Sequence, residues 1–454
     1  ESRHQPVALL KLAAYLKNIG VEAKLFNFLA TPHGGRVRRE LVNKIKVNGF
    51  EFRKYRIGAT KTEFYRTLKE YQNLGWVPQE MWMTTLTTYW WPGLLEASEI
   101  ALRVFPNLKI KIGGLYPTLF SSHAANQFNT DIILEGSEFH NLYYNGDPLV
   151  DGSTVLVTGN IPQVCLLRPD YSILPNAEYG VFQVRCGPLK DYSGGEFLLP
   201  GGRHQFKPVS EIFNDIVHWN EEFGISHFTC YDDKIACDDK GYTLKLLLRN
   251  IISNKLKIKL HFFNGLYPED IDCELAELLK EAGTLEIYFM PSLAETDEKR
   301  NSIYKTVATL LMSAGFKLRN LSVGGYFFVG APGEDLTTIL EKGLIVSHTL
   351  GFAIPVFYTP SPWTKNFFDI SSTLDVDKLS PHLFPMKHCS PLEYRHYDEI
   401  MRLFAMLNYP VKNTTFDFWG EGRVPSVLRN LIRQSAYDNT LSAVIGSCIG
   451  EGAR

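Results

Sequence analysis

One stretch of the sequence combines residue types that suggest chemistry. Between Val181 and Gly202 a short apolar strand pattern leads into a glycine-rich loop that carries Cys186. A cysteine thiolate is a metal ligand and a nucleophile, and a loop after the first strand of an α/β barrel is where such enzymes place reactive groups. We therefore expect this loop to be a functional centre. The alternative is that Cys186 is a small buried hydrophobic side chain.

Polar residues and glycines follow other predicted strands of the same half of the chain. Asp232 and Asp233 end one strand, Asn264 the next, and Gly330 a later one. The carboxyl ends of parallel strands meet at one edge of a sheet, so we expect these residues near the cysteine loop. The carboxylates suit a ribose or a substrate amine, and Gly330 permits close approach of backbone to a flat ring. Alternatively, the aspartates cap the following helix.

The elements that position these residues form a regular alternation, which predicts a partial (β/α)6 TIM-like barrel over residues 151–380. The predicted strands are Val181–Arg185, His227–Asp232, Ile258–Asn264, Leu285–Pro291, Leu321–Gly330 and Phe352–Tyr358, and the predicted helices are Val209–Phe223, Tyr242–Asn254, Ile271–Ala282, Thr306–Ala314 and Leu336–Thr349. Residues 381–454 are expected to form a helical C-terminal extension, with helices at Tyr394–Leu407 and Val424–Gln434.

The first half of the chain also alternates, and we expect a doubly wound, Rossmann-like α/β domain over residues 1–150. The pattern predicts a helix from Val7 to Gly20, a strand at Val21–Phe28, a basic loop over Thr31–Tyr55, helices at Glu63–Leu74 and Leu94–Phe105, strands at Met81–Thr88, Lys109–Ile112 and Asp131–Leu134, and a linker at Asn145–Pro162. A domain that opens on a helix suggests a further strand before it. Ligands of such sheets lie beyond the carboxyl ends of the strands.

Bulk properties narrow the range of partners. Lys+Arg 47 against Asp+Glu 49 leaves a formal net charge of -2, without the basic, aromatic-interleaved runs of nucleic-acid binders. Seven scattered cysteines do not have the spacing of a secreted disulfide framework. The apolar stretches, such as Leu321–Ala331, are shorter than the ~20 residues that span a bilayer. We therefore expect a cytoplasmic protein with a small-molecule substrate and no nucleic-acid or membrane partner.

Several motifs, in order, resemble those of the cobalamin-binding radical SAM enzymes. The resemblance is carried by the first helix at Pro6–Leu16, by TTLTTYWWPG from Thr84 to Gly93, by GGLYPT at Gly113–Thr118, by EGSE at Glu135–Glu138, by the strand end Cys230–Asp233, by Pro291–Asp297 and by FVGAPGE at Phe328–Glu334. It covers roughly residues 6 to 360. Each motif is weak alone, and the order and spacing of all of them carry the match.

The resemblance implies a set of cofactor contacts. Cobalamin would be held by Thr87, Thr88, Tyr89, Trp90, Gly113, Gly114, Leu115, Tyr116, Pro117, Thr118, Glu135 and Gly136; S-adenosylmethionine (SAM) by Gly194, Gly195, Glu196, Asp232, Asn264 and Gly330. The sequence lacks the Asp-x-His-x-x-Gly pattern that supplies a histidine to cobalt, since Thr31 stands where the aspartate of a motif around His33 belongs. The implied cobalamin therefore has no histidine below the metal.

The resemblance also implies a 4Fe-4S cluster, with Cys186 as a metal ligand. Family members hold it on a C-x3-C-x2-C motif, whose open iron binds SAM. After Cys186, Lys190 and Ser193 occupy the other two positions. Three explanations are open: the cluster has been lost, the two cysteines have been replaced, or the encoded protein has further residues in this loop, of which Cys186 is the last ligand.

The activity implied by the resemblance is that of a cobalamin-dependent radical SAM methyltransferase, a transferase that moves a methyl group from SAM through methylcobalamin to a carbon of a small molecule or natural-product precursor. Other family members catalyse rearrangements or oxidations. With a cluster present, an electron donor such as flavodoxin or ferredoxin is a further expected partner. The alternative is a cobalamin-binding protein without a cluster, which carries out polar methyl transfer or serves as a non-catalytic binding module.

Overall fold

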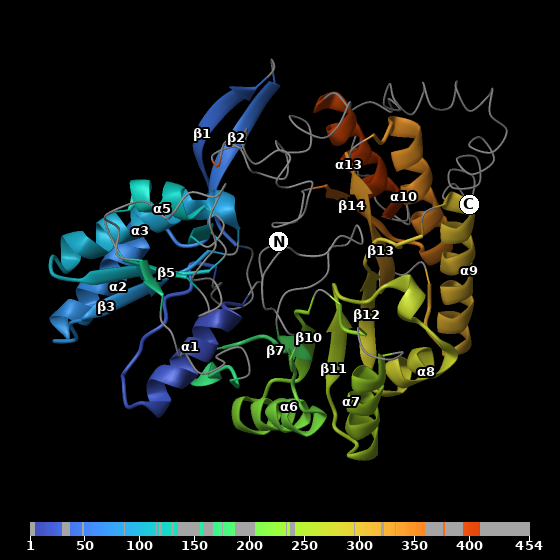
Figure 1. Cartoon of the computed structure of the whole chain (residues 1–454), viewed down its shortest axis with the longest axis horizontal. Coiled ribbons are helices and arrows are strands. Elements are labelled where there is room, and N and C mark those ends of the chain that lie inside the picture. The colour runs from blue at the N-terminus through green and yellow to red at the C-terminus, as the bar shows by residue number, and fades with distance from the viewer. Residues whose placement is uncertain are drawn as a thin grey trace, which may run out of the picture. The chain divides into compact units, whose positions relative to one another are not determined.

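A computed structural model defines the architecture (Figure 1). It describes residues 5–29, 37–47, 50–85, 87–114, 116–117, 120–128, 131–134, 155–157, 167–174, 176–186, 205–232, 234–236, 241–294, 296–318, 322–331, 333–358, 376 and 394–408. The contacts divide the chain into two compact units, with the main boundary between Ala177 and Glu178. The predicted domain boundaries at residues 150 and 380 fall outside the described residues and stay predictions.

The first unit contains a four-stranded parallel sheet in the order β3-β4-β5-β6. Its described elements are α1 (Val7–Asn18), β1 (Arg39–Val47), β2 (Phe50–Ile57), α2 (Lys61–Asn73), β3 (Glu80–Met83), α3 (Trp91–Val104), β4 (Lys109–Ile112), α5 (Ser121–Gln127), β5 (Asp131–Leu134) and β6 (Val155–Val157), with short 3-10 helices η2 (Thr88–Trp90) and η5 (Tyr171–Ile173). Parallel strands joined by helices confirm the α/β class. The strand order follows the chain order without a reversal, whereas a doubly wound sheet has a point at which the order reverses. The doubly wound arrangement therefore stays a prediction.

Two segments of this unit differ from the sequence-based expectation. The stretch Val21–Phe28, predicted as a strand, makes no β-ladder in the described structure; its aromatic rings pack instead on α2, with Phe26 and Phe28 at 4.7 and 4.9 Å from Phe64. The linker predicted at Asn145–Pro162 contains β6, which pairs parallel with β5. Short apolar runs such as Val155–Val157 are too brief to be recognised among surrounding turn residues.

The basic segment predicted as a loop is a β-hairpin. β1 and β2 pair antiparallel from Arg39↔Ile57 to Val47↔Phe50, with a bulge between Leu41 and Asn43. The reason is in the sequence: β-branched and aromatic residues alternate with charges, and Asn48-Gly49, between the strands, is a pair that favours tight hairpin turns.

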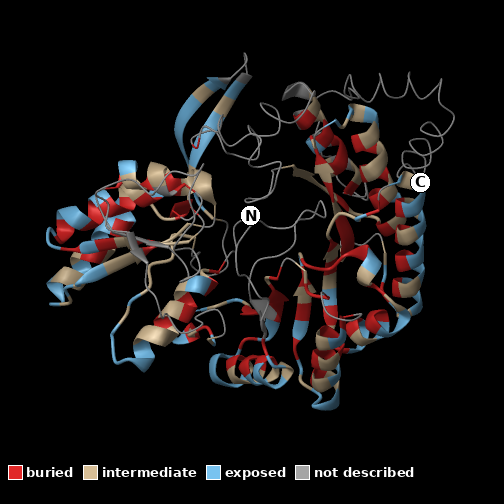
Figure 2. Cartoon of the chain, in the orientation of Figure 1, coloured by how far each residue is buried: buried red, intermediate tan, exposed pale blue. Residues whose placement is uncertain are grey.

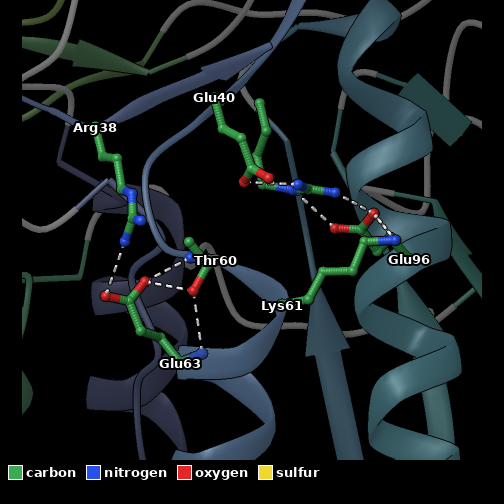
Figure 3. Close-up of polar contacts among 7 residues, drawn as sticks. Arg38, Glu40, Thr60, Lys61, Glu63 and Glu96 are labelled. Carbon is green, nitrogen blue, oxygen red and sulfur yellow. Dashed lines mark hydrogen bonds and ion pairs between the residues drawn. The ribbon is translucent and has the colours of Figure 1, made fainter. Parts of the chain in front are cut away.

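Charged contacts anchor this hairpin to the helices of its unit (Figure 3). Arg56 lies between two carboxylates, with Nη2 donating to Glu96 at 2.6 Å and Nη1 to Glu40 at 2.9 Å; Lys61 also reaches Glu96, at 2.6 Å. Burial raises the pKa of Glu96, but the hydrogen bonds from Arg56 and Lys61 outweigh it and lower the pKa overall. Glu96 is therefore held ionised between two cations.

The second unit is built on a six-stranded parallel sheet in the order β14-β13-β12-β11-β10-β7. Its strands are β7 (Gly180–Phe182), β10 (His227–Cys230), β11 (Lys259–Phe262), β12 (Thr284–Phe289), β13 (Val323–Val329) and β14 (Ala353–Phe357), and its helices are α6 (Val209–Phe223), α7 (Tyr242–Ser253), α8 (Cys273–Glu281), α9 (Asp297–Ser313), α10 (Leu336–Leu350) and α13 (Tyr394–Asn408), with the turn η7 (Pro268–Asp270). The six predicted strands are confirmed, several shortened by one to three residues at their ends. The helix predicted at Val424–Gln434 lies outside the described residues.

The two faces of this sheet have different environments. Buried residues are frequent along its strands (Figure 2). Phe228, Phe262 and Phe289, which share one face, are fully buried. Phe228 stacks on Trp219 of α6, and Gly325 lies against α10, so this is the face that the helices cover. Because side chains alternate along a strand, the intervening residues project to the opposite face.

Candidate functional site at the strand ends

Asp232 is the central residue at the carboxyl edge of the six-stranded sheet. It directly follows Tyr231 at the end of β10 and is 5% exposed. Its Oδ2 accepts a hydrogen bond from the backbone N–H of Val184 at 2.6 Å, and the thiol of Cys230 lies 3.4 Å from the same oxygen. Burial, followed by the neighbouring carboxylate, raises the pKa of the Cys230 thiol well above its usual value. Asp232 thus connects β10 to the segment that leads to Cys186.

Asn264 joins the same cluster from β11. Its Nδ2 donates to the backbone oxygen of Asp232 at 3.4 Å, and the N–H of Ile235 donates to the oxygen of Gly265 at 2.8 Å. Gly265 has φ +83°, and a Cβ there would lie 2.3 Å from the Asp232 oxygen. A glycine is required because the backbones approach so closely. Sequence reasoning predicted Asn264 and missed Gly265.

A second carboxylate near this edge was not predicted. Asp270, in η7, has its pKa raised to about 6 by burial, while Lys234 at 3.9 Å lowers it. Lys234 follows Asp232 by two residues and lies over the Tyr267 ring at 5.1 Å from its centroid. The signal in the sequence is weak, because Pro-Glu-Asp before a helix is also an ordinary helix start.

Gly330 ends β13 with φ +84°, a conformation that favours glycine. The loop after it is closed by Glu334, which accepts a hydrogen bond from the backbone N–H of Ala331 at 3.2 Å and pairs with Lys342 of α10. Asp335 then caps α10 by accepting from the N–H of Thr338 at 2.8 Å. The PGE motif therefore has a structural role in turning the chain from β13 into α10.

The structure describes only the first residues of the loop that is predicted to hold the cluster and SAM. Cys186 lies in the short strand β8 (Arg185–Cys186), which pairs antiparallel with β9 (Gln205–Phe206). Gly194, Gly195 and Glu196 lie outside the described residues, as do Asp233 and Glu295. Among the residues that are described, no group of three His, Cys, Asp or Glu could hold a metal ion. With Lys190 and Ser193 at the other motif positions, the sequence at hand does not fit a three-thiolate cluster site.

In the first unit, the predicted cobalamin residues gather at the ends of β3 and β4. The N–H of Gly113 donates to the oxygen of Met83 at 2.9 Å. Gly114 has φ +90°, and a Cβ there would lie 2.4 Å from the Thr84 hydroxyl. Two adjacent strand ends thus approach each other closely, as a flat ligand over this edge requires.

The loop between β3 and α3 differs from its prediction in detail. Thr88, Tyr89 and Trp90 form a 3-10 helix and are half-buried, and α3 begins at Trp91 instead of Leu94. The Oγ1 of Thr87 is buried and has no hydrogen-bond partner within the described part of the chain. A buried hydroxyl without a partner is costly, so this atom marks a position where a bound molecule would supply the missing bond.

Tyr116 does not fit a direct ligand contact. Its side chain is fully buried, its hydroxyl lies 2.7 Å from Nδ1 of His123, and its ring stacks on Trp91 at 6.5 Å. Pro117 beside it is also buried. These side chains therefore pack in the interior of the first unit. Leu115, Thr118, Glu135 and Gly136 lie outside the described residues.

The comparisons with known proteins found similar solved structures, but no matching family model or curated sequence. Two solved structures of the cobalamin-dependent S-adenosylmethionine radical enzyme OxsB match, one with aqua-cobalamin bound (16% identity, TM-score 0.43, 69% of this chain and 49% of that chain) and one apo and SeMet-labelled (15% identity, TM-score 0.42, 70% and 48%). The chain spans about half the length of these structures. No protein-family model matches the sequence, and no curated protein matches it significantly.

No helix among the described residues has the length and apolar character needed to cross a membrane.

Proposed function

We propose that this chain is a cobalamin-binding, SAM-dependent enzyme of the radical SAM class, and a methyltransferase acting on a carbon of a small molecule. The observation that carries the proposal is the position of the motif residues that the structure describes. Asp232, Asn264 and Gly330 follow strands of one parallel sheet at its carboxyl edge. Thr87 and Gly113 follow β3 and β4, which are adjacent strands of another. The two solved neighbours belong to this class, but at TM-scores of 0.43 and 0.42 their likeness adds no weight.

The chain's own residues supply binding and orientation in this proposal. Thr87 offers a buried hydroxyl at the edge where cobalamin would lie, and Gly113 and Gly114 keep side chains away from that edge. When bound, cobalamin would supply a transferable methyl group. The hydrogen bond from Asn264 to the backbone oxygen of Asp232 joins the ends of β10 and β11, where the resemblance implies that SAM binds.

The cobalamin part is tested by binding. Hydroxocobalamin should remain with the wild-type chain after desalting, as seen by its absorption spectrum. Thr87→Val removes the unpartnered hydroxyl at nearly constant volume, so the unfolding temperature should stay equal or rise while cobalamin affinity falls about fivefold, the effect of one hydrogen bond. Thr309→Val on α9, in the second unit, is the matched control and should leave binding unchanged. Failure of the wild-type chain to retain cobalamin would overturn the proposal.

The second candidate, a cobalamin protein without a cluster, is favoured by Lys190 and Ser193 in the motif positions. Anaerobic reconstitution with iron and sulfide discriminates the two. A broad cluster absorbance together with reductive cleavage of SAM supports the radical enzyme; bound cobalamin with neither of these supports polar transfer or a binding module.

A further inference from the structure

Three side chains form a hydrogen-bonded row on the face of the six-stranded sheet opposite the one that contacts α6 and α10. Nδ1 of His227 on β10 lies 2.9 Å from Nε2 of His261 on β11, and Nδ1 of His261 lies 2.5 Å from Oε2 of Glu286 on β12. The two imidazole planes differ by only 23°, so the rings share the hydrogen bond edge to edge. The row crosses three neighbouring strands and is separate from the strand-end cluster around Asp232.

The row has a defined hydrogen-bond direction. An ionised Glu286 only accepts, so a neutral His261 carries its proton on Nδ1 and presents a lone pair at Nε2. That lone pair accepts from Nδ1–H of His227, which leaves Nε2 of His227 as a hydrogen-bond acceptor. Glu286 thus sets the tautomer of His261 and, through it, that of His227. The Nε2 of His227, at the exposed end of the row, is a hydrogen-bond acceptor.

A buried hydroxyl lies next to this row. Thr229 is 4% exposed, and its Oγ1 has no hydrogen-bond partner among the residues that the structure describes. Thr229 is the register partner of His261 and shares a strand face with His227, two residues before it. The desolvation cost of such a group is recovered only when something bonds to it. Thr229 therefore adds a polar group next to the row on the same strand face.

Aromatic side chains continue the same face. Phe263 is 38% exposed, lies nearly parallel to His261 with ring centroids 5.6 Å apart, and contacts Tyr288 at 5.4 Å. Tyr288 in turn contacts Tyr326 at 6.3 Å. Parallel rings with one exposed face favour stacking of a flat apolar group.

We propose that this face is a binding site for a flat aromatic small molecule with one N–H or O–H donor, which stacks near Phe263 and donates to Nε2 of His227. The site needs neither cobalamin nor SAM, so its test does not depend on the proposed function. The charged and titratable groups that face His227 are Lys259 and His261 on β11 and Glu286 on β12. Burial, then His261 and Lys259, lower the pKa of His227, while Glu286 raises it.

The direct test uses two probes, one with a ring N–H donor and one in which a methyl group replaces that hydrogen. Indole has the ring N–H, and 1-methylindole lacks it at almost the same shape. Calorimetric titration of the full wild-type chain should show indole binding about five to ten times more tightly, the effect of one hydrogen bond. In His227→Leu, and in Glu286→Gln, which no longer fixes the tautomer, the ratio should fall to about one. His218→Leu on α6 is the control and should keep the wild-type ratio.

Nitrogen NMR of histidine-labelled wild-type chain gives a second measurement, which needs no variant to fold. It should show both His227 and His261 as Nδ1–H tautomers at neutral pH. Equal affinities of the wild-type chain for the two probes, or an Nε2–H tautomer at His227, would overturn the proposal.

Discussion

At the residue scale, the structure separates glycines that backbone approach requires from those that only turn the chain. Gly265 and Gly224 both have positive φ, +83° and +66°, but only Gly265 faces the Asp232 backbone oxygen, whereas a Cβ at Gly224 meets nothing within 4 Å in the described part of the chain. The sequence could not distinguish them, because each is a glycine after an apolar segment. The difference depends on a strand that is distant in sequence.

Gly265→Ala should therefore be far more damaging than Gly224→Ala. Both variants bear the cost of positive φ, about 1 kcal/mol; only the first forces the β10 and β11 ends apart. We expect Gly265→Ala to lower the free energy of unfolding by roughly 2 kcal/mol or more beyond Gly224→Ala, measured by denaturant titration. Equal effects would show that the approach of Asp232 and Gly265 is not as close as described.

Asp270 gives a pH-dependent prediction. Its pKa is about 6 in the folded chain against a usual 3.8, so the folded state binds the proton more tightly than the unfolded state. The stabilisation from this proton is complete below about pH 4 and is lost as pH rises through about 6. Asp270→Asn should remove this dependence, so the variant should gain stability relative to wild type between pH 4 and pH 6, by about 2 kcal/mol.

The measurement is chemical denaturation of both chains at several pH values. Glu269→Gln, at the exposed neighbour of Asp270, serves as the control and should leave the pH dependence nearly as in wild type. A wild-type stability profile parallel to that of Asp270→Asn would contradict the raised pKa.

At the element scale, the regular alternation of strand and helix patterns made the elements of the second unit predictable. The first unit contains irregular segments, and its elements were less predictable. The strand at Lys109–Ile112 and the helix at Val209–Phe223 were predicted to the residue, since apolar periodicity and glycine ends mark them. The β1–β2 hairpin was mistaken for a loop because charge outweighed its β-branched pattern. The Glu286–His261–His227 row was not predicted, because strand register decides which side chains meet.

The anchoring of this hairpin rests on Arg56. Its side chain is 18% exposed and bridges Glu40 and Glu96, while Arg53, 60% exposed, lies 3.9 Å from Glu51. Arg56→Leu removes this cation from the partly buried Glu96 and from the exposed Glu40, whereas Arg53→Leu loses a weak surface pair. Amide hydrogen exchange in β1 and β2 should speed up about tenfold or more in Arg56→Leu and stay near the wild-type rate in Arg53→Leu. Similar exchange in both variants would show that packing, not charge, holds the hairpin.

At the scale of the whole molecule, the two units bear different parts of the proposed function. Each has its own parallel sheet and its own buried interior, and the residues proposed to hold cobalamin fall in one unit and those proposed to hold SAM in the other. The class of the sheets was predictable from sequence, since strand and helix patterns alternate in both halves. The function of the cluster loop was not predictable, because only one of the three ligand positions of the motif is a cysteine, and a single cysteine is compatible with several chemistries.

This division predicts which amides each cofactor protects. A ligand that binds the folded state alone lowers the rate of local opening around its own site. Hydroxocobalamin should therefore slow amide exchange around Met83–Trp91 and Gly113–Gly114, and leave Thr229–Asp232 near its free rate. SAM should give the converse pattern, with protection at Asp232 and Asn264. Cobalamin protection confined to the second unit would contradict the assignment of the first unit's sheet edge, and SAM protection of neither unit would leave the chain as a cobalamin-binding module.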